Sequence, residues 1–217
     1  MSIVKNTARQ VIPAPIWNRL AALRPELLIA SLFVNLLKPL SLLTRVNVVE
    51  RLVPVGYLDF PGRKIYMRVD TRLQLQRLNA CKKEPETVEW LRSQLREGDV
   101  FYDIGANVGA YSFVALALVN NQCKSYAFEP GFSTFSALCY TVILNGLDGK
   151  FIPLCLALDR EPQAVTFTYS SILPGASEHA MHKVITENGK QQQGFSQILL
   201  SNTLDNLICT MVLNNPI

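Results

Sequence analysis

Apolar and polar positions from residue 100 onward alternate in blocks that predict strands and helices in turn. Between the predicted strands, residues 108–119 and 132–144 have the length and apolar content of helices. The runs of strand length are residues 100–104, 125–128, 151–158 and 164–169. This succession predicts an α/β fold, with parallel strands joined by right-handed crossovers and with helices on both faces of the sheet.

The part of the chain before residue 81 has a less regular pattern. The elements predicted from there to the first strand of the sheet are a helix over 18–38 with a break before Pro25, short strands over 46–55 and 63–69, a short amphipathic helix over 71–79, and a helix that begins at Glu84-Pro85-Glu86 and ends at Gly98. We therefore expect a mainly helical extension over residues 1–80 and a second domain over residues 81–217.

Residues 27–37 form the most apolar run of the chain, interrupted by Ser31 and Asn35. A helix of that length spans roughly 16 Å, about half the core of a bilayer. The run also starts too late for a secretory signal. The predicted helix is either buried against the main domain or lies in a membrane interface, and the short length of the run favours burial. Peripheral membrane contact through residues 18–43 therefore remains an alternative.

Composition and charge exclude several classes of protein. Apolar residues make up 49% of the 217 residues and charged residues 18%, which excludes intrinsic disorder. The charge balance is +8 over residues 1–97 and −4 over residues 98–217. The basic residues are scattered, which argues against nucleic-acid binding. Five widely spaced cysteines without a C-x-x-C pair argue against a disulfide framework or a metal site and indicate a cytoplasmic protein.

The chemistry is concentrated at the end of the first predicted strand of the sheet. Residues 103–110 read Asp-Ile-Gly-Ala-Asn-Val-Gly-Ala, and small residues there allow a ligand to approach the backbone between strand and helix. The next strand ends in Glu129-Pro130, 24 residues after Gly105. An acidic residue at that place suits hydrogen bonding to ribose hydroxyls. The pattern predicts a nucleoside-containing cofactor at the carboxyl ends of the strands.

The loop sequence also discriminates between nucleosides. A dinucleotide-binding loop has glycine where this chain has Asn107, and the Asp103 carboxylate would repel a pyrophosphate. The nucleotide-binding pattern G-x-x-x-x-G-K-[ST] is absent. A carboxylate attracts cations instead, and S-adenosylmethionine carries an ammonium, a sulfonium and a ribose without phosphate. We expect S-adenosylmethionine as the cofactor.

Several segments together resemble the FkbM-type methyltransferases in order and spacing, over about residues 84–208. They are Gly-Asp-Val-Phe-Tyr-Asp-Ile-Gly-Ala-Asn-Val-Gly at 98–109, Phe-Glu-Pro at 128–130, Leu-Asn-Gly-Leu at 144–147, Ala-Leu-Asp at 157–159 and Thr-Leu-Asp at 203–205. The resemblance implies a class I, Rossmann-like, S-adenosylmethionine-dependent fold that methylates a hydroxyl oxygen of a sugar or natural product. The acceptor would then be a small molecule or a glycan.

The resemblance also assigns cofactor-binding residues by position. The loop residues Asp103, Gly105, Ala106, Asn107 and Gly109 would lie along the methionine half of the cofactor, and Glu129 would hold the ribose. The residues expected to bracket the adenine are Pro130, Gly131, Phe132, Ala157 and Leu158. No residue is assigned as catalytic base and no metal is implied.

The chain departs from the family after residue 205. The family continues into a K-I-D-x-E-G-type segment, whereas residues 207–217 contain no such acidic segment. We therefore expect a C-terminally truncated member with an incomplete sheet. Two alternatives follow: an inactive cofactor-binding remnant, and a membrane-surface or interaction module. His179 and His182 either belong to an acceptor pocket or are solvated, and their loop position favours solvation. Asp159 is either a cofactor contact or a turn residue.

Overall fold

The computed structural model describes residues 25–177, 179–181 and 194–210. The chain divides into two compact units, Met1–Leu52 and Val53–Ile217. The sequence placed the boundary at residue 80. Residues 53–80 instead belong to the unit that contains the parallel sheet.

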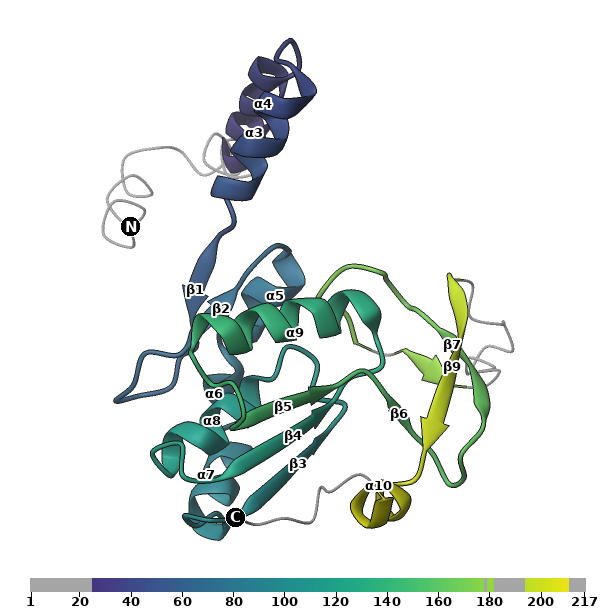
Figure 1. Cartoon of the computed structure of the whole chain (residues 1–217). Helices are drawn as coiled ribbons and strands as arrows, with labels where there is room; N and C mark the ends of the chain where they lie inside the picture. The colour runs from purple at the N-terminus through teal and green to yellow at the C-terminus, as the bar shows by residue number, and fades with distance from the viewer. Residues whose placement is uncertain (1–24, 178, 182–193, 211–217) are drawn as a thin grey trace, which may run out of the picture. The chain divides into compact units, whose positions relative to one another are not determined.

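The first unit contains two helices, α3 (Pro25–Leu37) and α4 (Leu42–Arg51) (Figure 1). Helix α3 begins at Pro25, where the sequence predicted a break, while residues 18–24 lie outside the described residues. The prediction of a strand over residues 46–55 is wrong for its first part, because α4 continues to Arg51. The Ser41 side chain accepts a hydrogen bond from the Thr44 backbone N–H at 3.2 Å, and this N-cap starts the helix despite its valines.

Neither helix of the first unit buries a residue within the unit. Seven large apolar side chains of the two helices are more than 60% exposed: Leu28, Ile29, Leu32, Leu36, Leu42, Leu43 and Val49. Among the described residues, no helix has both the length and the apolar content to cross a bilayer. Packing of α3 against the main domain, which the sequence favoured, stays a prediction.

The second unit is built around a parallel sheet of three strands, in the order β3 (Val100–Ile104), β4 (Lys124–Phe128) and β5 (Phe151–Leu154). Helices α8 (Ala110–Leu118) and α9 (Phe132–Leu144) connect the strands (Figure 1). Ile104 pairs with Phe128, and Phe128 pairs with Leu154, so the three carboxyl ends lie at one edge. The predicted Rossmann-like α/β arrangement is confirmed for these elements.

Helices cover both faces of this sheet, although unequally. Buried side chains of α8 and α9 pack with Ala127 and Phe151 on one face, where most of the core lies. On the other face Tyr126 and Phe128 pack with Leu207 of the short helix α10 (Leu204–Thr210). The alternation along β4 explains the two layers, because successive strand residues point to opposite faces.

The segment before the sheet packs on α9. Strands β1 (Val55–Tyr57) and β2 (Tyr66–Arg68) form an antiparallel pair. The Tyr66 backbone N–H donates to Asn145 Oδ1 at 2.9 Å, and the Arg68 N–H donates to Thr141 Oγ1 at 3.3 Å. The helices that follow are α5 (Arg72–Arg77), α6 (Ala80–Lys83) and α7 (Pro85–Gln94). These contacts explain why the segment joins the second unit.

The strand predicted over residues 151–158 is divided in two. Strand β5 ends at Leu154, and β6 (Ala157–Leu158) pairs with β9 (Ser196–Asn202) in a second sheet. The Leu154 carbonyl accepts from both Leu156 N–H and Glu129 N–H at 3.0 Å, so the chain turns where a straight strand would continue. The second sheet has the order β6-β9-β7-β8, with β7 (Ala164–Thr168) and β8 (Ala180–Met181).

Candidate functional site

The loop between β3 and α8 has a backbone conformation that requires glycine or asparagine at three positions. Gly105, Asn107 and Gly109 have φ angles of +75°, +52° and +80°. Glycine and asparagine tolerate this left-handed region best. A Cβ at Gly109 would lie 2.5 Å from Leu138 Cδ1, whereas a Cβ at Gly105 would meet nothing within 4 Å. Gly109 is therefore required for packing, and Gly105 faces open space that a ligand can enter.

The backbone N–H groups of this loop already have acceptors. Gly105 and Ala106 both donate to the Phe128 carbonyl, at 2.9 and 3.0 Å. Asn107 donates to Glu129 Oε2 at 2.9 Å, and Val108 donates to the Asn107 side-chain oxygen at 3.0 Å. The loop therefore lacks the array of free donors with which phosphate-binding loops hold their ligands. This agrees with the sequence argument against a dinucleotide.

Asp103 lies in β3 immediately before the loop. One of its oxygens, Oδ2, accepts a hydrogen bond from Ser112 Oγ at 2.7 Å. Burial raises the pKa of Asp103, while the hydrogen bonds from Ser112 act in the opposite direction. A carboxylate in such a place is stabilised by a nearby cation.

Glu129 follows β4 and is 4% exposed. Its Oε2 accepts from Asn107 N–H, and its Oε1 accepts from Gly131 N–H at 2.7 Å. Burial raises the pKa of Glu129, whereas these two hydrogen bonds lower it; Asp103 raises it further and Arg77 lowers it. Glu129 thus ties the loop after β3 to the turn after β4. A carboxylate has about four acceptor positions, so further hydrogen bonds remain available to a ligand.

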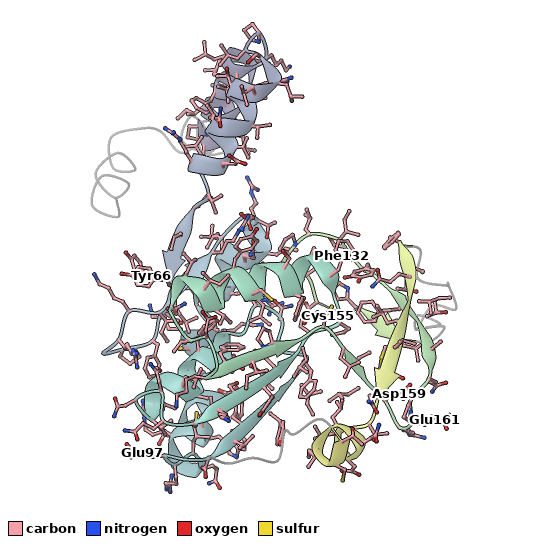
Figure 2. All side chains as sticks on the ribbon, in the orientation of Figure 1. Tyr66, Glu97, Phe132, Cys155, Asp159 and Glu161 are labelled. Atoms are coloured by element: carbon pink, nitrogen blue, oxygen red, sulfur yellow. The ribbon has the colours of Figure 1, made fainter. Side chains whose placement is uncertain are left out.

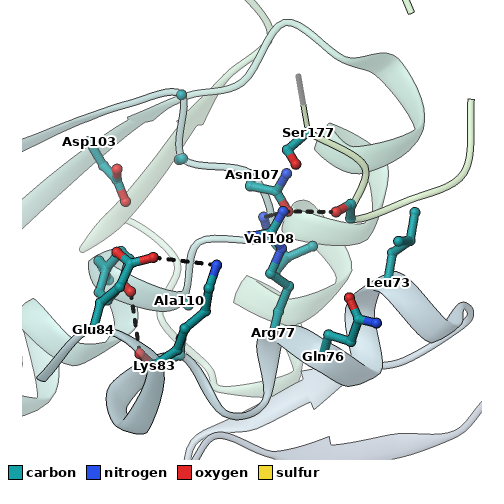
Figure 3. Close-up of a pocket in the computed structure, with 15 residues that line it drawn as sticks. Leu73, Gln76, Arg77, Lys83, Glu84, Asp103, Asn107, Val108, Ala110 and Ser177 are labelled. Atoms are coloured by element: carbon teal, nitrogen blue, oxygen red, sulfur yellow. Dashed lines mark hydrogen bonds and ion pairs between the residues drawn. The ribbon is translucent and has the colours of Figure 1, made fainter. Parts of the chain in front are cut away.

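Two cavities meet at this loop. The larger, of about 470 Å³, has Asp103, Ala106 and Tyr111 in its wall and is closed by residues of α5 and α6 (Figure 3). The smaller, of about 290 Å³, is lined by Glu129 and by residues that follow β5 and β7. Gly105, Asn107 and Ser177 line both cavities. An elongated ligand could therefore lie across the loop and reach into both.

Most of the residues that the sequence singled out lie in these walls. Those in the larger cavity are Asp103, Gly105, Ala106 and Asn107, and those in the smaller are Gly105, Asn107, Glu129, Pro130, Ala157 and Leu158. Gly109 and Phe132 line neither. Gly109 lies buried at the start of α8, and the Phe132 ring, at the start of α9 in Figure 2, packs against Tyr169 at 5.4 Å between centroids.

Asp159 and His179 were left open by the sequence. Asp159 accepts hydrogen bonds from Arg160 N–H at 2.7 Å and from Gln163 Nε2 at 3.1 Å, which are contacts of a turn residue. His179 lines the smaller cavity and packs against the rings of Phe167 and Tyr169. His179 is therefore half-buried in the cavity wall, which favours the pocket alternative over a fully solvated loop residue, and burial lowers its pKa. His182 lies outside the described residues.

Sequence reasoning missed the far wall of the larger cavity. That wall contains Arg77, Lys83 and Glu84 from α5, α6 and the residue after α6, together with Gly175 from the loop after β7. Lys83 Nζ lies 3.6 Å from Glu84 Oε1. The amphipathic pattern of residues 71–79 predicted a helix there, but nothing in the pattern related it to the loop after β3.

No protein-family model matches the chain. The chain is 28% identical over 114 residues to the hexuronic acid methyltransferase AglP of Haloferax volcanii, a match that covers 52% of this chain and 44% of AglP. It therefore spans less than half the length of that relative. A solved SAM-dependent methyltransferase from Agrobacterium tumefaciens aligns with 48% of this chain and 32% of its own, with a TM-score of 0.35 and 15% identity. About half of the chain is thus similar in sequence to a sugar-acid methyltransferase.

Proposed function

We propose that the protein binds S-adenosylmethionine and transfers its methyl group to a hydroxyl of a sugar or other small-molecule acceptor. One observation carries the proposal: two cavities share a glycine loop as part of their walls, and this loop lies between two carboxylates and has no N–H group left for phosphate. This arrangement suits a long nucleoside ligand that is cationic at one end. The similarity to AglP supports the same chemistry.

The residues present fit such a cofactor along its whole length. Asp103 in the larger cavity would face the cationic amino-acid end. Glu129 in the smaller cavity would accept hydrogen bonds from the ribose hydroxyls, and the small or apolar residues Pro130, Ala157 and Leu158 would contact the adenine. Gly105, which has room at its Cα, would let the ligand cross the loop.

When bound, the cofactor supplies a methyl group that its sulfonium makes electrophilic. The chain contributes position: holding an acceptor hydroxyl in line with the methyl group can lower a barrier by about 7–11 kcal/mol. The acceptor must also lose its hydroxyl proton to a base. Residues of α5 and α6 form the cavity wall that faces the loop, beside which the acceptor would lie.

The acceptor class and the finer family assignment are part of this proposal. The order and spacing of the segments at 98–109, 128–130, 144–147 and 203–205 support an FkbM-type methyltransferase. The name of AglP supports an acidic sugar as acceptor. We expect oxygen methylation of such a sugar.

Calorimetric titration of the full chain tests the cofactor. We expect S-adenosylmethionine and S-adenosylhomocysteine to bind, and NAD⁺ and ATP to bind far more weakly, because both carry phosphates that Asp103 repels. Transfer of a tritiated methyl group to glucuronate or glucose then tests turnover. Binding without transfer to any sugar would favour the inactive remnant, and preferential binding of NAD⁺ would contradict the proposal.

We also propose that the first unit contacts a membrane surface, as a cytoplasmic protein lying against a bilayer would. The seven exposed apolar side chains of α3 and α4, flanked by Lys38, Arg45 and Arg51, support an interfacial position beside anionic lipid. Flotation with vesicles that contain phosphatidylserine should fall in the double variant Leu32→Glu and Leu36→Glu. Flotation of this variant equal to that of wild type would exclude contact through α3, and the double variant Leu32→Ala and Leu36→Ala separates the effect of added charge from that of lost apolar surface.

A further inference from the structure

The larger cavity contains separated charges of both signs. The Asp103 carboxylate enters it from β3, and the Arg77 guanidinium enters it from α5. Figure 3 shows both side chains in the cavity wall, with the Lys83 amine between them in that view. A ligand that fills this space therefore meets the Asp103 carboxylate and the Arg77 guanidinium, while the Lys83 amine pairs with Glu84 in the same wall.

Arg77 is held in place without an ion pair among the described residues, although it lies near enough to Glu129 to lower the pKa of that carboxyl. Its Nη2 donates to the Gly175 carbonyl at 3.2 Å, and none of the ion pairs in the described part of the chain includes Arg77. A guanidinium has five N–H donors, so one bond to a carbonyl leaves most of them free. Lys83, by contrast, is exposed and pairs with Glu84.

The carbonyl that positions Arg77 is itself fixed. The Gly175 N–H donates to Thr134 Oγ1 at 3.2 Å, and Thr71 Oγ1 donates to the Pro174 carbonyl at 2.7 Å. The Asn107 side chain donates to the Ala176 carbonyl at 2.6 Å. Residues 174–176 are therefore tied to α5, to α9 and to the loop after β3. The guanidinium of Arg77 is held beside that loop before any ligand binds.

We propose that Arg77 is the carboxylate-binding residue of this cavity. A half-buried guanidinium with free donors matches the two oxygens of a carboxylate in a bidentate hydrogen-bonded pair. The inference rests on the proposed function, which offers two sources of that group: the amino-acid carboxylate of the cofactor and the carboxylate of an acidic sugar. In either case Arg77 selects a ligand that carries a carboxylate over one that does not.

Binding of two matched ligands distinguishes the cofactor as the source. S-adenosylhomocysteine carries the amino-acid carboxylate, and 5′-(3-aminopropylthio)-5′-deoxyadenosine is the same molecule without it. In calorimetric titrations, Arg77→Gln should weaken S-adenosylhomocysteine by about tenfold or more and leave the decarboxylated ligand unchanged. Arg77→Lys should keep part of the affinity, because it keeps the charge without the planar fork.

Sugar binding tests the other source. If S-adenosylhomocysteine binds Arg77→Gln as well as wild type, the variant should instead lose affinity for glucuronate and keep its affinity for glucose. The matched control is Arg72→Gln, at the exposed start of the same helix, which should change neither ligand. Thermal unfolding followed by circular dichroism checks that each variant is folded.

The outcomes separate this inference from the proposed function. Failure of wild type to bind S-adenosylhomocysteine would contradict the proposed function, while the glucuronate titration would still decide whether Arg77 binds a carboxylate. The inference is overturned if Arg77→Gln is folded and binds S-adenosylhomocysteine and glucuronate as wild type does. It is also overturned if Arg72→Gln produces the same losses.

Discussion

Replacement of Glu129 tests whether its side chain stabilises the loop after β3 by linking it to the turn after β4. Each carboxylate oxygen accepts one backbone N–H, from Asn107 and from Gly131. In Glu129→Gln one oxygen becomes an amide NH₂, so one of the two N–H groups faces a donor and loses its acceptor. Leaving a buried donor unsatisfied costs about 1–3 kcal/mol. Glu129→Ala removes both acceptors, and the same reasoning gives about 2–6 kcal/mol.

Urea unfolding measures these costs. We expect the free energy of unfolding to fall in the order wild type, Glu129→Gln, Glu129→Ala, with a loss of about 1–3 kcal/mol at the first step. The control is Glu97→Gln, because Glu97 is exposed and lies outside both cavities. A Glu129→Gln protein as stable as Glu97→Gln would refute the reasoning that Glu129 ties the loop to the turn after β4.

The pH dependence adds a second readout for the same residue. Burial raises the pKa of Glu129 in the folded protein above its value in the unfolded chain. The folded state therefore binds this proton more tightly, and the resulting stabilisation is complete below the unfolded-state pKa. It is lost as the pH rises through the folded-state pKa. The stability difference between wild type and Glu129→Gln should accordingly be larger at low pH, and a difference that grows as the pH rises would contradict this sign.

Two further predictions concern the loop and its charge. Gly109→Ala should reduce the free energy of unfolding in urea by about 2–5 kcal/mol, because the new Cβ would have a positive φ and would also lie 2.5 Å from Leu138 Cδ1. Gly105→Ala should cost about 1–2 kcal/mol, because only the positive φ opposes it. Equal losses in the two variants would argue against the packing role of Gly109. Burial raises the pKa of Asp103, so the affinity for S-adenosylhomocysteine should fall by up to about tenfold per pH unit below that pKa. In calorimetric titrations at several pH values, Asp103→Asn should make the affinity depend less on pH. If Asp103→Asn leaves this pH dependence unchanged, another group is responsible for it.

The central sheet could be predicted from the sequence because its signals are local. The bounds of β3 and α9 are those that the apolar runs gave, since the runs end at residues such as Asn145 and Gly146 that stop regular structure. The same is true of the loop after β3, where small residues and one asparagine occupy positive-φ positions. Local backbone preference determined these features, so a single sequence was enough.

The sequence failed where a contact from outside the segment decided the structure. Valines over residues 46–49 favour a strand, but the cap at Ser41 starts a helix that includes them. Residues 151–158 have the length of one strand, but the Leu154 carbonyl accepts hydrogen bonds from Glu129 and Leu156, and the chain leaves the sheet there. The apolar pattern shows neither the Ser41 cap, which is a single polar side chain, nor the contact with Glu129, which lies more than twenty residues before Leu154.

The candidate site likewise contains residues that the sequence could predict and residues that only tertiary contacts bring to it. Asp103 and Glu129 stand at the ends of adjacent parallel strands, so the topology alone brings them to the same edge of the sheet. Arg77 reaches the loop because residues 174–176 connect α5 to it, through hydrogen bonds between side chains and backbone that no periodicity records. The sequence therefore indicates which nucleoside the loop accepts. The proposed binding of the ligand's carboxylate depends instead on Arg77, which only the folded chain places beside that loop.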